Sequence, residues 1–501
     1  MFKKKNIYND INNENQIRKK KLIEMKKYGF SFPNNFKKTI NSKEIYKLYK
    51  NKTTNELKKN KINITISGRM IQRRIMGKAS FFILKDIEGR IQIYIKETSI
   101  TTEFYHNQFK KLDIGDILGI YGYLFKTKTK ELSIHATNII ILNKCLKNLP
   151  DKFHGLSNQE KRYRKRYLDF ITNEKLYNIF KNRSKIIQFI RKFMIKNKFL
   201  EVETPMLHSI PGGASARPFK TYHNEIDQEM YLRIAPELYL KQLIIGGFER
   251  VFELNRNFRN EGVSTRHNPE FTMMEAYIAY SDYQYMMKFT ENLLISIIKY
   301  LFDKKIIKYK EHILNFNQPF CKLTMQEAIL KFNPNICISD LKNLKKIKII
   351  ANNIGLKNKT SNIGEINNEI FEKTVEKNLI QPTFITEYPV EVSPLARRND
   401  INNNTTDRFE LFIAGYEIGN GFSELNDVDD QKNRFLNQIK KTEKEKNKDI
   451  LYDSNYIEAL KYGLPPTSGL GIGIDRLIMI LTNQKSIREV ILFPTLRKFL
   501  K

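Results

Sequence analysis

The feature of the chain that most limits its possible folds is a pair of strand-like runs, ERVFELNRNF and EFTMMEAYIAY, around a charged loop at residues 260–269. Apolar and polar residues alternate in both runs, so the pair predicts a β-hairpin. The loop is longer than a tight turn requires, and long loops on a rigid scaffold often carry binding groups. The stretch FRNEGVSTRHNPEFTMME also crowds both charge signs onto this hairpin, which indicates a site.

Further strand patterns surround this hairpin and predict the architecture of the C-terminal part. Residues 174–199 form an amphipathic helical run that leads into KNKFLEVETPML, whose strand is stopped by Pro205. Helical and irregular Lys/Asn-rich sequence fills residues 283–380, and strands return in FITEYPVEVS and DRFELFIAGYEIGNGFSEL. Strands with helices grouped outside them predict an antiparallel α+β domain rather than a parallel Rossmann sheet.

The N-terminal part has a different texture. Residues 1–60 are polar and Lys/Asn-rich, and we expect them to form a helical extension. From residue 61 to residue 146, short alternating strands punctuated by Gly predict a five-stranded OB-fold β-barrel, although strand texture alone fits any small β-barrel. Residues 147–173 are expected to form a basic linker, and residues 174–501 the α+β domain, with a helical insertion at about 300–380.

Composition limits the class of protein and its compartment. The 501 residues include 87 Lys plus Arg against 54 Asp plus Glu, and the net charge of +33 attracts polyanions such as nucleic acid. Abundant Lys, Asn and Ile without Trp also indicate AT-rich coding DNA, so part of the charge reflects compositional bias.

The three cysteines fit neither a disulfide framework nor a zinc site, which favours a reducing cytoplasm; they are Cys145, Cys321 and Cys337. No apolar run approaches the roughly 20 residues of a membrane span, and the start lacks a secretory signal.

The segment DRFELFIAGYEIGNGFSEL predicts a second hairpin that carries paired carboxylates. A two-residue turn at residues 414–415 would place Phe412 opposite Glu417. Glu410 would then face Gly419, and Glu410 and Glu417 would be diagonal neighbours with β-carbons about 7 Å apart or less. Two carboxylates held so close repel each other, and a hard divalent cation bound to substrate phosphates relieves the repulsion. The pair therefore predicts magnesium with a nucleoside triphosphate.

The glycines of the second strand of this hairpin decide which side chains share its pocket. Regular alternation would turn Asn420, Phe422 and Glu424 away from Glu417. The Gly-Asn-Gly at residues 419–421 can hold a β-bulge that reverses this parity and brings all of them into one pocket. The alternative is an exposed hairpin with solvated glutamates, which has no need for two glycines in its second strand.

The first hairpin supplies the opposite charge. On its second strand Phe271 and Glu275 share a face, so an aromatic ring and a carboxylate can line a cleft. Arg259, Arg266 and His267 can contact phosphate oxygens, which an arginine fork suits especially well. Any one of these residues is compatible with an ordinary surface ion pair, but their crowding beside the carboxylate pair indicates a triphosphate site.

Two further segments contribute to the predicted site. GLGIGIDRLIMIL passes from a glycine-rich strand into a helix without the surrounding βαβ unit of a dinucleotide fold. Gly469, Gly471 and Gly473 are therefore expected to let a ligand lie against the strand, with Arg476 projecting from the following turn. Glu237, in APELYLKQL, begins a helix, and its default interpretation is structural because it complements the helix dipole.

Taken together, these segments resemble the class II aminoacyl-tRNA synthetases, and specifically the bacterial-type lysyl-tRNA synthetases, from about residue 20 to the C-terminus. FLEVETPML resembles the first motif of that family, FRNEGVSTRHNPEFTMME the second and GLGIGIDRLIMIL the third. IPGGASARPF, YLRIAPELYLKQL, VSPLARRND and GFSELND are also similar to that family's sequence. The aspartate and asparagine relatives share the barrel and the three motifs, but not this full set.

The resemblance implies a ligase that forms lysyl-adenylate and pyrophosphate from lysine and ATP, and then transfers the lysyl group to the 3′-end of tRNA(Lys) for protein biosynthesis. The implied catalytic residues are Arg259, His267 and Arg476. The implied ATP-binding residues are Arg259, Glu261, His267, Asn268, Phe271, Glu410, Glu417 and Arg476, with adenine between Phe271 and Arg476. Magnesium, more than one ion per subunit, would lie on Glu410 and Glu417. The implied lysine-binding residues are Gly213, Glu237, Arg259, Glu275, Tyr277, Asn420, Phe422 and Glu424, which overrides the structural interpretation of Glu237. The implied anticodon-binding residues are Arg74, Phe81, Gln92 and Glu131.

Two alternative functions share parts of this pattern. An enzyme that lysylates a protein has the same catalytic core, but such relatives lack the β-barrel. A tRNA-binding or regulatory protein without catalysis usually loses active-site charges, whereas every matched position is present here. An aspartate pocket would need cations where this chain offers Glu275 and Glu424, so side-chain chemistry favours lysine. The resemblance also implies a cytoplasmic homodimer paired through residues 182–206, without a membrane partner.

Overall fold

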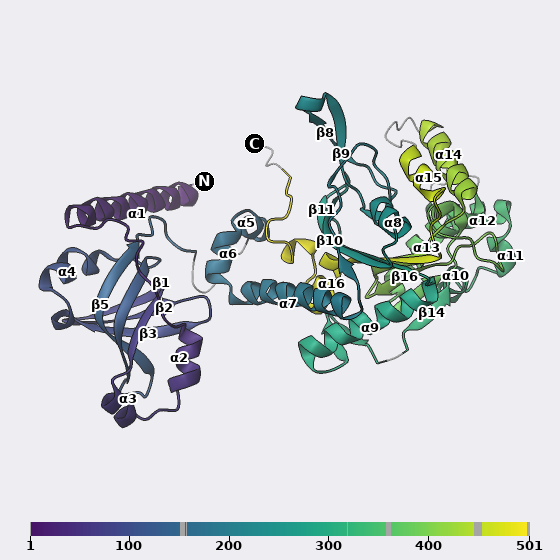
Figure 1. Ribbon diagram of the computed structural model, residues 1–501. Coiled ribbons are helices and arrows are strands. Elements are labelled where there is room, and N and C mark those ends of the chain that lie inside the picture. The colour runs from purple at the N-terminus through teal and green to yellow at the C-terminus, as the bar shows by residue number, and fades with distance from the viewer. Residues whose placement is uncertain are drawn as a thin grey trace. The chain divides into compact units, whose positions relative to one another are not determined.

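The computed structural model describes residues 2–150, 156, 158–317, 319–356, 362–444 and 453–497. The chain divides into two compact units, Met1–Leu156 and Ser157–Lys501 (Figure 1). Within the described ranges, every helix is too short or too polar to cross a membrane.

The N-terminal unit is built on a closed β-barrel with the strand order β1-β2-β3-β5-β4. Buried and half-exposed side chains alternate along its strands, and Phe82, Leu84 and Ile93 lie in the barrel core. The five-stranded barrel predicted from this alternation is confirmed. Its strands are β1 (Asn63–Met76), β2 (Ala79–Lys85), β3 (Arg90–Lys96), β4 (Ile117–Lys126) and β5 (Leu132–Asn143).

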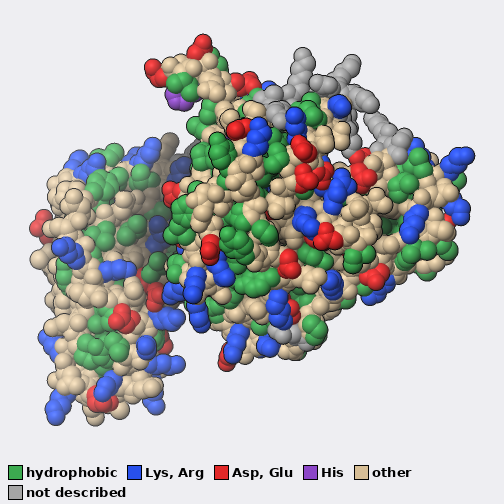
Figure 2. Space-filling view, turned by 45° about the vertical axis from the view of Figure 1, so that its right-hand side comes forward, with side chains coloured by type: hydrophobic (Ala, Val, Ile, Leu, Met, Phe, Trp, Pro, Cys, Tyr) green, Lys and Arg blue, Asp and Glu red, His purple; other side chains and the backbone are tan. Residues whose placement is uncertain are grey.

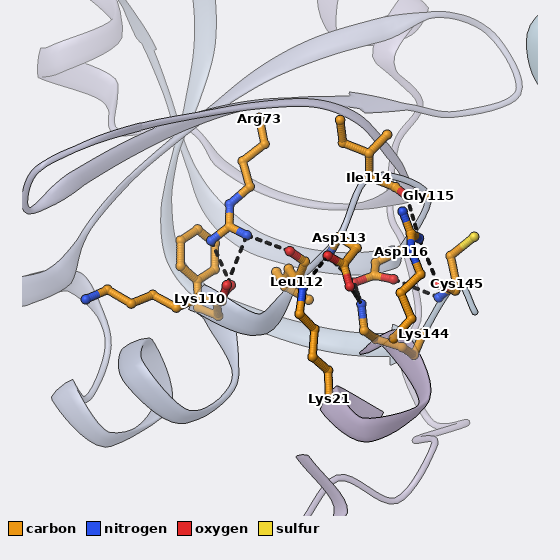
Figure 3. Close-up of polar contacts among 12 residues, drawn as sticks. Lys21, Arg73, Lys110, Leu112, Asp113, Ile114, Gly115, Asp116, Lys144 and Cys145 are labelled. Atoms are coloured by element: carbon orange, nitrogen blue, oxygen red, sulfur yellow. Dashed lines mark hydrogen bonds and ion pairs between the residues drawn. The ribbon is translucent and has the colours of Figure 1, made fainter. Parts of the chain in front are cut away.

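Four α-helices accompany the barrel: α1 (Phe2–Lys27), α2 (Ser42–Tyr49), α3 (Thr54–Asn60) and α4 (Thr102–Asn107). A polar network fastens α1 to the segment before β4 (Figure 3). Lys21 of α1 donates to Asp113 at 2.6 Å, and the buried Lys144 contacts Asp113 at 2.5 Å and Asp116 at 2.8 Å. These contacts fix α1 to the barrel, because each charge in the network has an opposite charge beside it.

The C-terminal unit contains an eight-stranded sheet in the order β14-β15-β16-β17-β18-β11-β10-β6. Neighbouring strands are antiparallel except at the two edges, where β14 pairs with β15 and β6 pairs with β10 in parallel. The predicted antiparallel α+β domain is therefore confirmed. The strands are β6 (Leu200–Glu201), β10 (Arg250–Phe258), β11 (Glu270–Ala279), β14 (Cys321–Thr324), β15 (Thr383–Thr386), β16 (Arg408–Ile413), β17 (Tyr416–Ser423) and β18 (Thr467–Gly473).

The two faces of this sheet carry different kinds of side chain. On one face Phe252, Met274, Leu411 and Leu470 pack with helices α7 (Glu174–Lys196), α9 (Tyr283–Phe302) and α16 (Ile474–Leu481) into the largest core. Because side chains alternate along a strand, their neighbours project from the opposite face. Those neighbours include charged residues, so one face stabilises the fold while the other is free to form a site.

Smaller elements surround the sheet. They are α5 (Gln159–Arg164), α6 (Arg166–Thr172), α8 (Glu237–Ile245), α14 (Val428–Lys444), α15 (Ser454–Leu460) and a small sheet of β7 (Leu207–His208), β8 (Phe219–His223) and β9 (Gln228–Leu232). Between α9 and β15 lie α10 (Met325–Phe332), α11 (Ile338–Leu341), α12 (Leu344–Asn353) and α13 (Ile363–Thr374) around their own core. The hairpin β12 (Ile306–Tyr309) and β13 (His312–Asn315) precedes them and was not predicted from the sequence.

Lys and Arg side chains are spread over the face of both units that Figure 2 shows, mixed with polar and apolar side chains rather than gathered in one patch. The net charge of +33 therefore does not by itself mark a binding surface on that face. Individual sites, and not the overall charge, therefore indicate the function.

Candidate active site

A cavity of about 460 Å³ lies on the polar side of the large sheet. Its lining comes from the loop between β10 and β11, from β11, β16, β17 and β18, from the first turns of α8 and α16, and from the segments 213–215 and 392–396. These segments are far apart in the sequence. The cavity nevertheless brings together all the residues predicted to contact ATP, lysine or magnesium, namely Gly213, Glu237, Arg259, Glu261, His267, Asn268, Phe271, Glu275, Tyr277, Glu410, Glu417, Asn420, Phe422, Glu424 and Arg476.

Strands β16 and β17 form the predicted hairpin. Ala414 and Gly415 make its turn, both at positive φ (54° and 73°), which is the backbone conformation that such a tight turn requires. Phe412 lies opposite Glu417, as predicted. The turn therefore fixes the register at the closed end of the hairpin.

The register further along this hairpin differs from the prediction. Glu410 lies opposite Asn420 and not opposite Gly419. The partner of Glu410 lies one residue later in β17 than expected, because Ile418 is the extra residue of a β-bulge. The predicted bulge thus exists just before the Gly-Asn-Gly at 419–421 rather than within it, and it places both sides of the bulge in one cavity.

Glu410 and Glu417 experience different electrostatic surroundings. Glu410 accepts hydrogen bonds from Arg408 and, at 2.8 Å, from Tyr388. Burial raises the pKa of Glu410 to about 7, and Glu417 adds to the rise against the opposing Arg408. Burial acts on Glu417 too, but Arg476 and Arg259 outweigh it and hold the pKa of Glu417 below its ordinary value.

The raised pKa of Glu410 shows that its negative charge is incompletely compensated, which is the condition that a bound cation relieves. Both carboxylates offer the hard oxygen ligands that magnesium prefers. Within the described part of the chain, no group of three or more His, Cys, Asp or Glu is arranged to hold a metal ion. A magnesium ion on this pair would therefore complete its coordination with phosphate oxygens and water, as it does in nucleotide sites.

The phosphate-facing groups of the second predicted motif lie on the same side of the cavity. The Arg259 guanidinium lies 5.1 Å from the centroid of the Phe271 ring, and its Nε has no partner among the described residues. Arg476, in the first turn of α16, donates to Glu417 at 3.0 Å and lies 3.2 Å from Nε2 of His267. Burial and Arg476 lower the pKa of His267, so its imidazole is neutral near pH 7.

Two residues predicted to contact ATP, Asn268 and Glu261, lie in different surroundings. The side chain of Asn268 is buried, donates to the carbonyl of Glu270 at 2.6 Å and accepts from the backbone of Thr495 at 3.1 Å. Asn268 therefore braces the loop with both ends of its amide. Glu261, in contrast, is exposed at the cavity rim.

The opposite part of the cavity is acidic. Glu237, Glu275 and Glu424 are all buried there, together with the hydroxyl of Tyr277, which donates to Glu275 at 3.4 Å. Burial raises the pKa of Glu275 to about 8, and Glu237 adds to the rise. Lys241, which the sequence interpretation did not single out, bonds Glu237 at 2.7 Å and forms an ion pair with Glu424. Lys241 thus pairs with two of the three buried carboxylates.

The glycines of β18 make room for this acidic wall. A Cβ added at Gly469 would lie 2.7 Å from the Tyr277 ring and would collide with the carboxylate of Glu424. A Cβ at Gly471 would lie 3.1 Å from the side chain of Met273. Gly469 was predicted to let a ligand lie against the strand. Its surroundings show that the absence of a side chain leaves room for Tyr277 and Glu424.

Other residues that position the site were missed in the sequence. Arg408 donates hydrogen bonds to Glu410 and, at 3.0 Å, to Asn420. Its position two residues before Glu410, on the same face of the strand, could have indicated this role. Asp475 accepts from Arg183 of α7 at 2.5 Å and from the backbone of Thr272 at 2.8 Å. This second network ties α7, β11 and α16 together, and no local pattern predicts it.

In the N-terminal unit, three of the four predicted anticodon residues lie on the neighbouring strands β1, β2 and β3, and the fourth, Glu131, directly precedes β5. Arg74 pairs with Phe81, which pairs in turn with Tyr94, and the two rings are 4.8 Å apart. Phe81 is half-exposed, in contrast to the core residue Phe82, so it is available for stacking. Tyr94 extends the aromatic surface to His135, 5.1 Å away, a group that was not predicted.

The other two members of the predicted set are polar. Gln92, two positions from Tyr94 on β3, donates to Ser133 at 3.2 Å. Glu131 stands exposed just before β5 and accepts from Tyr46 at 2.8 Å. Aromatic rings flanked by hydrogen-bonding groups are the usual surface for single-stranded RNA.

Each of the two units matches a known protein family. Residues 158–497 match the family model of tRNA synthetases class II (D, K and N), and residues 64–142 match that of the OB-fold nucleic acid binding domain. The antiparallel sheet, its cavity and this match together define a class II tRNA synthetase. The chain belongs to that family, and full-length relatives narrow its place within it.

A protein named Lysine--tRNA ligase from Buchnera aphidicola subsp. Schizaphis graminum is 76% identical over 503 aligned residues, covering 100% of both chains. Lysine--tRNA ligase from Buchnera aphidicola subsp. Acyrthosiphon pisum is 70% identical over 98% of both chains. Lysine--tRNA ligase from Pectobacterium carotovorum is 55% identical over 97% of both. The branch of class II to which the chain is similar along its whole length is therefore that of the lysine–tRNA ligases.

Proposed function

We propose that the chain activates L-lysine with ATP and transfers the lysyl group to the 3′-end of tRNA(Lys), for protein biosynthesis. In the first step a carboxylate oxygen of lysine attacks the α-phosphorus of ATP, and pyrophosphate leaves. In the second step the terminal ribose hydroxyl of the tRNA loses its proton and attacks the lysyl carbonyl, and AMP leaves. Neither step needs a covalent enzyme intermediate, so catalysis is positioning and charge stabilisation.

The observation that carries the choice of lysine is the charge of the acidic pocket. Glu237, Glu275 and Glu424 are buried, while the ammonium of Lys241 compensates one of these three charges. A lysine substrate brings two ammonium groups, one at Cα and one at the end of its side chain. Two ammonium groups balance the two remaining carboxylates, whereas a neutral or acidic side chain would leave buried charge unpaired.

We assign the nucleotide to the other part of the cavity. Arg259 is proposed to hold the α-phosphate and the substrate carboxylate, since its guanidinium lies 5.1 Å from the Phe271 ring and its charge also acts on Glu275. The adenine ring is proposed to stack between Phe271 and Arg476, with Glu261 and Asn268 near the adenosine. His267, which lies 3.2 Å from Arg476, is proposed to contact the outer phosphates.

Magnesium is proposed to accompany ATP, with Glu410 and Glu417 as its protein ligands and more than one ion per subunit. When bound, it neutralises part of the triphosphate charge and favours the departure of pyrophosphate. The carboxylates themselves are held in place by Arg408, Tyr388 and Arg476. Glu410, whose pKa is raised by burial, would ionise fully as the cation binds.

The barrel at residues 61–146 is proposed to bind the anticodon of tRNA(Lys). Phe81 offers a stacking face, and Arg74, Gln92 and Glu131 offer polar groups for base edges. The same barrel favours tRNA over a protein as acceptor of the lysyl group, because the matched family of residues 64–142 binds nucleic acid.

A cytoplasmic homodimer is proposed as the working form. Apolar side chains of the segment at residues 182–206 and just beyond it, including Ile195, Leu200, Met206 and Leu207, are exposed in the single chain. Exposed apolar residues concentrated on one segment favour a partner surface. A monomer in sedimentation at micromolar concentration would contradict the proposal.

The proposed function is tested by ATP–pyrophosphate exchange with each amino acid in turn, followed by aminoacylation of tRNA(Lys). Exchange should depend on lysine and charging on the tRNA. Ornithine keeps the charge but lacks one methylene, a difference of about 1–3 kcal/mol, so it should be the nearest competitor. Exchange with aspartate or asparagine in place of lysine, or no exchange at all, would overturn the assignment.

A further inference from the structure

The acidic pocket contains a fully buried lysine that the reaction itself does not use. Lys241 lies on α8, one helical turn after Glu237, and its side chain is completely inaccessible to solvent. A buried ammonium is costly unless it is paired, so its place in a substrate pocket requires an explanation. Its Nζ bonds Glu237 at 2.7 Å and pairs with Glu424, which follows β17.

The surroundings of Lys241 hold it where it is. The rings of Phe422 and Tyr456 lie 5.5 and 6.0 Å from its Nζ, and both rings are within the distance of a cation–π contact. Phe422 also lines the cavity. The ammonium of Lys241 is therefore held by groups of the cavity wall, since Glu237 and Glu424 line the cavity as well.

Glu424 shows what the ammonium does for the pocket. Neither of its carboxylate oxygens has a hydrogen-bond partner of good geometry among the described residues, so the ion pair with Lys241 is what fixes it. Burial raises the pKa of Glu424, and Lys241 is the group that opposes the rise. Burial would lower the pKa of Lys241, but Glu237 and Glu424 outweigh it and keep the pKa above its ordinary value, so the ammonium stays charged.

We propose that Lys241 is a positioning residue for substrate selection, which orients Glu237 and Glu424 and sets the charge that they present to lysine. The inference rests on the proposed function, because it takes Glu237 and Glu424 as carboxylates that bind the substrate lysine. Without Lys241, three carboxylates would meet a substrate with two ammonium groups, and one buried charge would remain unbalanced. With Lys241, the pocket and the substrate match in charge.

The test measures ATP–pyrophosphate exchange for wild type and for Lys241→Met, which keeps most of the length of the side chain and removes its charge. We expect the KM for lysine to rise by roughly 30-fold to 3,000-fold, the effect of unpairing a buried charge. The KM for ATP should change far less, since Lys241 pairs with Glu237 and Glu424, which are assigned to lysine and not to ATP. If Lys241→Met does not fold, Lys241→Gln serves the same comparison.

Two further measurements separate positioning from a merely structural role. The first is a double-mutant cycle, in which Lys241→Met should have a much smaller effect in a Glu424→Gln background, because the two residues act as a unit. The second is the pH profile of the KM for lysine, whose fall with rising pH should shift to higher pH in Lys241→Met. The charged and titratable groups that face this pair are Glu237 on α8, Glu275 and Tyr277 on β11 and Tyr456 on α15.

Lys144→Met is the matched control, since Lys144 is also fully buried between two carboxylates, but in the barrel unit. It should leave the KM for lysine unchanged. Equal rises in the KM for lysine and ATP, additive effects in the cycle or an unshifted pH profile would each overturn the inference. Absence of lysine-dependent exchange in wild type would instead overturn the proposed function.

Discussion

The two units of the chain each bury a lysine between two carboxylates, and the two networks are completed to different degrees. In the barrel, Asp116 also accepts from the backbone of Asp113 and of Cys145, both at 2.7 Å, and Asp113 accepts from Lys21 (Figure 3). In the cavity, Lys241 pairs with Glu237 and Glu424, but neither carboxylate oxygen of Glu424 has a further hydrogen-bond partner among the described residues, and burial raises the pKa of Glu275 to about 8.

Unsatisfied buried polar groups therefore distinguish a recognition site from a structural network within one molecule. Buried polar groups of a finished fold are almost always satisfied, so a deficit in a native protein requires an explanation. The barrel network has no such deficit at Lys144, and it serves stability. The pocket around Lys241 lacks positive charge, and the substrate supplies it.

The largest expected effect is on the stability of the barrel. Lys144→Met leaves Asp113 and Asp116 buried without their shared cation, which costs about 3–5 kcal/mol of unfolding free energy. Hydrogen exchange of peptides from β4 and β5 should show the loss. Lys52→Met, at an exposed pair with Glu56, is the control and should change stability by less than about 1 kcal/mol. Equal effects of both variants would show that the barrel network is not stabilising.

The next effect concerns catalysis rather than stability. Glu275→Gln keeps the shape of the side chain and removes one charge from the pocket, so kcat/KM for lysine should fall by an amount equivalent to about 2–5 kcal/mol. The KM for ATP should change little. A variant that kept wild-type lysine kinetics and lost ATP affinity would place Glu275 in the nucleotide site instead.

A smaller effect is expected on the outer surface of the barrel. Phe81→Ala removes a half-exposed stacking face and should weaken aminoacylation of tRNA(Lys) by about 1–3 kcal/mol, the contribution of one stacked base. Pyrophosphate exchange should be unaffected, because Phe81 belongs to the other unit. Losses of the same size in both assays would indicate that Phe81 supports folding.

The smallest effect is expected at the proposed metal ligands. Glu410→Gln should raise the magnesium concentration needed for half-maximal exchange by about tenfold, since the second carboxylate and the phosphates still bind the ion. The variant should also lose the ionisation with pKa of about 7 that burial imposes on Glu410. Magnesium titrations identical to wild type would remove Glu410 from the metal site.

Much of this molecule could be predicted from its sequence, because alternation and turn residues are local signals. The pairing of Phe412 with Glu417 followed from the turn, and the presence of a bulge followed from the two glycines beyond it. The position of the bulge at Ile418 did not follow, since any residue from 418 to 421 could be the extra one. The β12–β13 hairpin was missed because its strands have only 4 residues each.

The electrostatics of the pocket could not be predicted, because they depend on contacts between distant segments. Helical spacing places Glu237 and Lys241 on one face of α8, but nothing local connects either of them to Glu424. Asn268 was predicted as a ligand contact, but its additional contact with the backbone of Thr495, near the C-terminus, could not be predicted from the local sequence. Charge compensation is a property of the assembled site.

The most direct test of the charge deficit is the number of protons released when lysine binds, measured by titration calorimetry in buffers of different ionisation enthalpy. In the empty pocket, burial raises the pKa of Glu275 to about 8, so this carboxyl is mostly protonated at pH 7. Pairing with the substrate ammonium lowers that pKa again. We therefore expect release of up to about one proton per lysine at pH 7, an affinity that rises as pH approaches 8, and neither effect in Glu275→Gln. Lysine binding without proton release, and with the same affinity from about pH 6 to pH 8, would contradict the account.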